Sequence, residues 1–264
     1  MKLFLQIFRN SVSEVTAYRL NFTLWRFRLL LRLLILFFLW QAIYSSQSNV
    51  FGYSESQMLT YILLSQIVAT FIFSSKTQEF GELIYTGNLS NWLTKPINIF
   101  KYLIARDIAD KSLNFIFSVA EVSLVFIIFS PPIFISQSVN ILPWVFISII
   151  LGIIMYFMVS FLLSLVSFWT QESWAHRFLF FVISDFLAGG LFPLDILPQN
   201  LYKILLLTPF PYMMYFPLKI YIGGLSGNEI ITGFTVLIFW LFIFYFAYKY
   251  LWKKGLRLYT AEGR

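Results

Sequence analysis

The sequence has no cysteine, a single histidine, and charged side chains at only 12% of its 264 positions. Without cysteine there are no disulfides, no thiol catalysis and no thiolate metal site. One histidine, His176, cannot supply a histidine-based metal cluster, and its place beside Arg177 in a short turn favours a plain interfacial role. No stretch matches the phosphate-loop pattern G-x-x-x-x-G-K-[ST], which excludes ATP binding by that device.

The sequence is instead rich in apolar residues. It is 59% hydrophobic, with a mean hydropathy of +0.77, whereas a soluble domain is roughly half apolar and a quarter charged. Its 32 phenylalanines, 15 tyrosines and 8 tryptophans suit a lipid-facing chain with aromatic residues at the membrane interfaces. The composition therefore predicts an all-α integral membrane protein with one membrane domain over residues 1–264. Its net charge of +7 belongs to loops beside anionic lipid and does not indicate a nucleic-acid partner.

Apolar runs predict six transmembrane helices. Several are shorter than the ~20 residues that a bilayer core requires, so neighbouring polar residues must continue them. In the fourth run, small residues such as Gly152 and Ser160 permit close helix contact, as do Ser164 and Ser167. The predicted spans are residues 29–44, 57–75, 113–129, 143–169, 178–192 and 230–252.

Lysine and arginine alternate between high and low density along the loops. Because basic loops stay on the cytoplasmic side, this alternation predicts both termini in the cytoplasm of a multi-pass cell-membrane protein. Lysine and arginine together number 6 in residues 1–32, 5 in residues 76–111, 1 in residues 170–177 and 5 in residues 249–264. The loops on the opposite side have none at 45–56 and 130–143, and 2 at 193–228, which are Lys203 and Lys219.

Residues 1–28 predict an amphipathic helix that lies in the membrane interface, because five apolar residues share one helical face. The alternative is a solvated helix packed on another subunit. The charged N-terminal region before the first apolar run is too long for a signal peptide, and no cleavage site of small residues follows that run. The five residues are Phe4, Ile7, Phe8, Val12 and Val15.

The cytoplasmic segment 76–111 reads as two short amphipathic turns that Gly87-Asn88 separates and Pro96 closes. Acidic residues beside the apolar stripe favour a protein partner, and a connector lying on lipid is the alternative. Two i, i+4 pairs, Arg106/Asp110 and Asp107/Lys111, predict that the third span continues into the cytoplasm as a helix. The predicted docking residues are Glu79, Phe80, Glu82, Leu83, Ile84, Leu89, Trp92 and Leu93.

The segment 193–228, on the outer side, is strongly apolar but too rich in proline for one helix. It predicts re-entrant half-helices, with an external loop on lipid headgroups as the alternative. Gly189-Gly190 before it allows a bend or close packing, and Asp195 is expected to cap a short helix. The residues singled out are Pro193, Asp195, Pro198, Pro209, Pro211 and Pro217.

Two carboxylates fall inside predicted spans, Glu121 and Asp185, with no lysine or arginine expected at their depth. Intramembrane acids mark either a polar pathway or proton site, or a buried hydrogen-bonded pair. For the second role Gln66 or Asn114 is the expected partner of Glu121.

Together these features, and above all GELIYTGNLSNWLTKP (81–96) and FPLDILPQNLYKILLLTPFPYMMYFP (192–217), resemble the permease subunits of ABC-2-type exporters. The similar branch is that of small six-span permeases labelled as multidrug or antibiotic exporters. The resemblance covers essentially the whole chain, and its motifs are patterns of glycine, proline and apolar residues.

The resemblance implies a permease without catalytic activity, in a bacterial cell membrane. It implies a second permease, identical or paralogous, and separate ABC ATPase subunits that bind the ATP and magnesium. Residues 1–28 resemble the connecting helix, part of 79–95 the coupling helix that enters a cleft on the ATPase, and 193–217 the outer re-entrant helices. By this division the chain begins with the connecting helix at residues 1–28, followed by the first two spans at 29–75 and the coupling segment at 76–111. The next three spans lie at 112–192, the outer segment at 193–228, and the last span with the C-terminal tail at 229–264.

Two other functions stay open. A proton-coupled secondary transporter would use Glu121 or Asp185, although no internal repeat of the kind common in such folds is detectable. A membrane enzyme acting on a lipid-linked substrate would need a catalytic cluster at one interface, and the loops offer only scattered polar residues.

Overall fold

The computed structural model describes residues 2–94, 99–136, 138–170 and 174–259, and helices form nearly all of its regular structure. This confirms the expected all-α class. One two-residue hairpin, β1 (Asn49–Val50) and β2 (Tyr53–Ser54), follows the second helix. The helices are α1 (Lys2–Ala17), α2 (Arg19–Tyr44), α3 (Glu55–Phe73), α4 (Gln78–Tyr85), α5 (Ser90–Leu93), α6 (Ile99–Phe129), α7 (Leu142–Leu165), α8 (Trp174–Leu187), α9 (Gln199–Leu205), α10 (Tyr215–Ile222) and α11 (Gly227–Leu256), with 3₁₀ turns at Val139–Ile141, Val166–Phe168, Leu194–Ile196 and Phe210–Tyr212.

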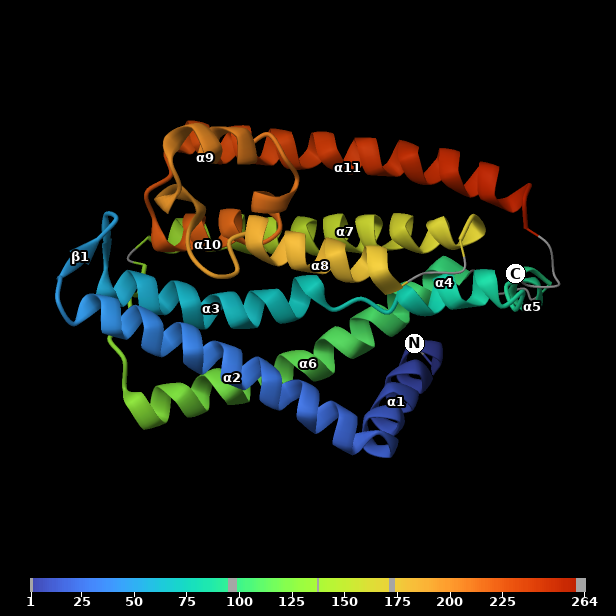
Figure 1. Cartoon of the computed structure of the whole chain (residues 1–264), viewed down its shortest axis with the longest axis horizontal. Helices are drawn as coiled ribbons and strands as arrows, with labels where there is room; N and C mark the ends of the chain where they lie inside the picture. The colour runs from blue at the N-terminus through green and yellow to red at the C-terminus, as the bar shows by residue number, and fades with distance from the viewer. Residues whose placement is uncertain (1, 95–98, 137, 171–173, 260–264) are drawn as a thin grey trace.

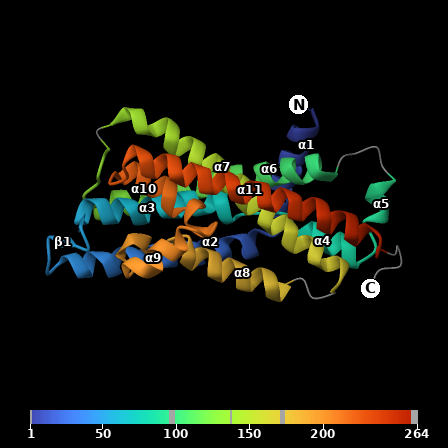
Figure 2. The same cartoon turned by 90° about the horizontal axis from the view of Figure 1, so that it is seen from above.

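The long helices run along one axis as an elongated bundle (Figure 1). The β-hairpin, α9 and α10 lie towards one end of it, and α1, α4, α5 and the end of α11 lie towards the other (Figure 2). The second end carries the basic segments, so it is the predicted cytoplasmic end. Below we call these the outer end and the basic end.

Among the described residues, five helical stretches are long and apolar enough to cross a membrane. They correspond to every predicted span except the fifth. There α8 has 14 residues, a length of about 21 Å against a hydrocarbon core of about 30 Å. A fifth crossing by residues 178–192 therefore stays a prediction. The five stretches are Arg19–Tyr44, Glu55–Tyr85, Ile99–Phe129, Val139–Phe168 and Gly227–Leu256.

Local sequence fixes where several helices begin and end. A serine side chain accepts a backbone N–H, and a side chain three residues on accepts in return, at the start of α3 (Ser54, Gln57) and of α11 (Ser226, Glu229). Helix α8 ends where Gly189 takes a left-handed φ of +86°. Gly190 then donates its N–H to the Asp185 carbonyl at 2.9 Å, closing the helix end. The bend predicted at these glycines is confirmed.

The outer segment folds back into the bundle. Helix α10 is almost wholly buried and packs on α7 and α3. A Cβ at Gly152 of α7 would lie 2.9 Å from the Met213 carbonyl, so this close approach needs a glycine. Burial in protein is what re-entrant backbone requires, while its depth in a membrane stays a prediction.

The bundle has two apolar clusters. The larger joins α2, α3, α7 and α10 through side chains such as Phe37, Tyr61 and Tyr215. The smaller lies at the basic end, where Phe80 of α4 stacks on Phe161 of α7 with ring centroids 4.9 Å apart. The second cluster anchors α4 and thereby positions the site described next.

Candidate functional site

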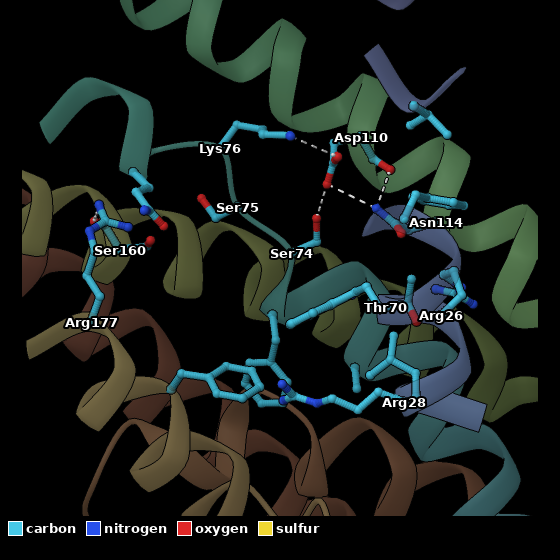
Figure 3. A pocket seen from close by; sticks show the side chains of 18 of the residues that line it. Arg26, Arg28, Thr70, Ser74, Ser75, Lys76, Asp110, Asn114, Ser160 and Arg177 are labelled. Carbon is cyan, nitrogen blue, oxygen red and sulfur yellow. Dashed lines mark hydrogen bonds and ion pairs between the residues drawn. The ribbon is translucent and has the colours of Figure 1, made fainter. Parts of the chain in front are cut away.

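A cavity of about 780 Å³ opens between α1, α2, α3, α4, α6, α7 and α8 in the half of the bundle nearer the basic end. This volume is within the usual range of small-molecule sites. Figure 3 shows the linker of residues 74–77 crossing the view, with Arg177 and Ser160 to one side and Asp110 and Asn114 to the other. The charged residues of its wall are Arg26, Arg28, Arg32, Lys76 and Arg177, with Glu14, Glu79, Glu82 and Asp110.

The linker that separates α3 from α4 is tied to α6. Ser74 donates its hydroxyl to Asp110, and the Lys76 ammonium lies 3.5 Å from the same carboxylate. The Lys76 backbone N–H donates to Asp107 at 3.1 Å. Asp107 in turn pairs with Lys111 at 3.2 Å, which confirms one predicted i, i+4 pair. These contacts hold the break in the second span against a neighbouring continuous helix, and Figure 3 shows those of Ser74 and Lys76 with Asp110.

The same linker is tied to α7 through Thr77, which is buried. Its hydroxyl lies 2.6 Å from the Ser160 hydroxyl, and its carbonyl accepts from Ser164 at 2.7 Å. Arg177 of α8 donates to the Ser160 carbonyl at 3.0 Å. Ser160 and Ser164, which were predicted to allow close helix contact, thus also form hydrogen bonds between α7 and the linker.

Arg106 of α6 connects three elements. Its guanidinium lies 2.7 Å from Glu14 of α1 and 2.7 Å from Glu79 of α4. The predicted pairing of Arg106 with Asp110 is wrong. Arg106 pairs with Glu14 and Glu79 instead, and Asp110 contacts the linker. The amphipathic N-terminal helix and the cytoplasmic segment are therefore joined at one side chain.

Glu121 pairs with Arg26 of α2, with Nε donating to Oε1 at 2.8 Å and Nη2 lying 2.7 Å from Oε2. The expectation that no basic residue shares its depth is wrong. Helix α2 begins at Arg19 rather than near residue 29, so Arg26 lies inside the helix. Gln66 also donates to Glu121, at 3.5 Å, whereas Asn114 bonds Asp110 instead.

Asp185 has a basic partner as well. Arg32 of α2 lies 2.8 Å from its carboxylate and also donates to the Gly190 carbonyl at 3.3 Å. The expectation that no basic residue shares the depth of Asp185 is therefore wrong as well, because Arg32 lies well inside α2 and not near its end. This ion pair connects α2 to α8.

Three of the eight predicted docking residues are turned inward. Phe80 and Leu89 have no exposed surface and Ile84 is 3% exposed, because all three pack in the cluster beneath α4. Glu82 and Leu93 are exposed, and Glu79, Leu83 and Trp92 are partly covered. A left-handed φ of +76° at Gly87 confirms the predicted break between the two turns. Pro96 lies outside the described residues.

At the outer end, the Asp195 carboxylate accepts from Tyr53 at 2.8 Å and from Lys219 at 2.7 Å. The predicted helix-capping role is wrong, because Asp195 lies within a 3₁₀ turn that begins after Pro193 and its carboxylate reaches the hairpin. Burial and the neighbouring carboxylate raise the pKa of Tyr53 well above its ordinary value, so this hydroxyl stays a donor. Of the prolines, Pro198 flanks α9, Pro209 and Pro211 form the next turn, and Pro217 lies in the first turn of α10, where a proline is tolerated.

Replacing Lys219 by methionine should lower the thermal unfolding midpoint of the purified protein in detergent, because Asp195 loses its cationic partner. The pair is partly exposed, so we expect a loss of about 1–2 kcal/mol. Lys203→Met is the matched control, since Lys203 is exposed on α9 and makes no ion pair among the described residues. Equal midpoints for both variants would show that the outer tie contributes no stability.

The residues that the sequence did not single out are mainly cations and linker residues. Arg26, Arg32, Lys219 and Thr77 each contact a partner more than 20 positions away. The one available signal was that α2 carries four arginines, while two acids fall inside predicted spans. Within the described residues no group of acidic or histidine side chains could hold a metal ion.

In a comparison with protein families, residues 30–263 fit the model of a family described as "ABC-2 family transporter protein". A search of curated proteins finds no match.

Proposed function

Because the chain belongs to this ABC-2 family of transporter proteins, and is thus a transmembrane permease, we propose that it serves an ATP-driven exporter. In this proposal two permeases, identical or paralogous, form the path, and separate ABC ATPase subunits bind ATP and magnesium. The chain itself then binds and releases cargo and carries out no hydrolysis.

One observation carries the proposal: α4 belongs both to the wall of the cavity and to the surface of the basic end. Glu79 and Glu82 line the cavity, while Glu82 and, just beyond on α5, Leu93 are exposed. A partner that presses on this surface would therefore move part of the cavity wall. Arg106 extends the same displacement to α1 and α6.

The geometry weighs against a proton-coupled transporter. Glu121 and Asp185, its two candidate proton sites, each lie within 2.8 Å of an arginine. Both carboxylates are thus engaged in ion pairs that join α2 to α6 and to α8. We therefore assign both acids a structural role.

Leu93→Asp should abolish co-purification of the ATPase subunits while leaving the permease folded. Leu93 is 51% exposed, so an aspartate there costs the fold little but places a charge in the proposed contact. Val139→Asp is the control, because Val139 is 73% exposed at the outer end, beyond reach of a cytoplasmic partner. Pull-down of a tagged permease measures the effect.

Undiminished recovery of the ATPase with Leu93→Asp would overturn the docking assignment. Leu89→Asp does not test it, because Leu89 is fully buried and its replacement would disrupt the cluster beneath α4.

A further inference from the structure

A second, smaller space shares two lining residues with the cavity. A groove of about 430 Å³ lies along α2, and Arg28 and Arg32 line both spaces. Apart from these two arginines, the groove is lined only by apolar side chains, at Leu24, Phe27, Leu31, Ile35, Leu36 and Leu191. The cavity and the apolar groove thus share two cations of α2.

The cations of the cavity are not all neutralised. Arg26, Arg32 and Lys76 have carboxylate partners, but within the described residues Arg28 and Arg177 have none. Arg28 lies over the Trp25 ring at 4.7 Å, an arrangement that leaves its N–H groups free to donate.

Arg177 bonds only neutral oxygens, and its buried Nε has no partner. Glu82, which makes no ion pair among the described residues, lies near enough to Arg177 for their charges to interact. Arg28 is therefore the cation of the wall that is left for an acidic ligand.

We propose that the cavity and groove together bind an anionic amphiphile, with its acidic head group at Arg28 and its hydrocarbon chain in the groove along α2. This proposal rests on the proposed function and names its substrate class. Guanidinium groups match phosphate and carboxylate oxygens with paired hydrogen bonds. A hydrocarbon chain in the apolar groove would be removed from water, and this transfer is favourable.

The test is competitive lipid binding to the full permease in a neutral detergent. Equal amounts of phosphatidylglycerol and phosphatidylcholine are added, and native mass spectrometry counts the bound lipid. Wild type should favour phosphatidylglycerol by about tenfold, and Arg28→Gln should lose most of that preference. Arg19→Gln, the same charge change on an exposed residue of α2 outside both spaces, should keep it.

Three outcomes would overturn the proposal: no preference in wild type, an equal loss in both variants, or displacement of the lipid by millimolar inorganic phosphate. The last would show a simple anion site. Because this measurement needs neither ATP nor ATPase, it can succeed where the proposed function fails. Stimulation of ATP hydrolysis by phosphatidylglycerol, in phosphatidylcholine nanodiscs holding the whole complex, tests whether the bound molecule is a substrate.

Discussion

Replacing Arg26 by methionine is expected to destabilise the permease by about 3 kcal/mol, because the change leaves the buried carboxyl of Glu121 without its partner. The two side chains are only 7% and 12% exposed, and no other cation lies beside Glu121 among the described residues. Gln66 alone, at 3.5 Å, cannot replace the guanidinium. The measurement is the thermal unfolding midpoint of purified protein, with membrane insertion followed in parallel.

A double variant separates ion pairing from packing. Arg26→Met combined with Glu121→Gln removes both charges and should recover most of the lost stability, whereas Glu121→Gln alone should be destabilising because it isolates Arg26. Additive losses in the double variant would show that the two residues act independently. In that case the pair does not hold α2 against α6.

The second large effect is expected at Arg106. Arg106→Gln should leave the ATPase subunits bound and hydrolysing ATP, yet remove the response of the cavity to ATP. The guanidinium is the shared partner of Glu14 and Glu79, and glutamine cannot pair with either. The cost in stability should be small, about 1 kcal/mol, since these carboxylates are partly exposed.

The cysteine-free sequence supplies a readout that needs no known substrate. Ala69→Cys places one thiol in the cavity wall, and its maleimide labelling rate should change roughly tenfold on ATP trapping in otherwise wild-type protein. Arg106→Gln should abolish that change, Arg106→Lys should reduce it, and Arg9→Gln on the exposed face of α1 should preserve it. An unchanged ATP response in Arg106→Gln would show that coupling bypasses this residue.

The sequence predicted the helical class and most helix positions because both depend on local signals. Apolar runs mark the long helices, Gly87 and Gly189 mark breaks with left-handed backbone, and prolines divide the outer segment. It also predicted that residues 99–111 extend the third span, and α6 is indeed continuous from Ile99 to Phe129.

The side-chain partners could not be predicted, because they join residues far apart in the chain. Arg26 and Glu121 are 95 positions apart, and Arg32 and Asp185 are 153 apart. The first span was predicted to begin at residue 29, whereas α2 begins at Arg19, so Arg26 was left outside the span and Arg32 was placed near its end. The apolar stripe of α4 was read correctly as one face, but it packs on the chain's own α7 rather than on a partner.

The contrast between α6 and its neighbour has a mechanical consequence. Helix α6 has 31 residues without glycine or proline, so it is a stiff rod of about 46 Å. A tilt of about 5° at the basic end would displace its far end by about 4 Å. The second span is divided by the linker at residues 74–77 and can bend there instead. One push at α4 would therefore reach the outer end along α6, while the linker lets α3 and α4 change the angle between them beside it.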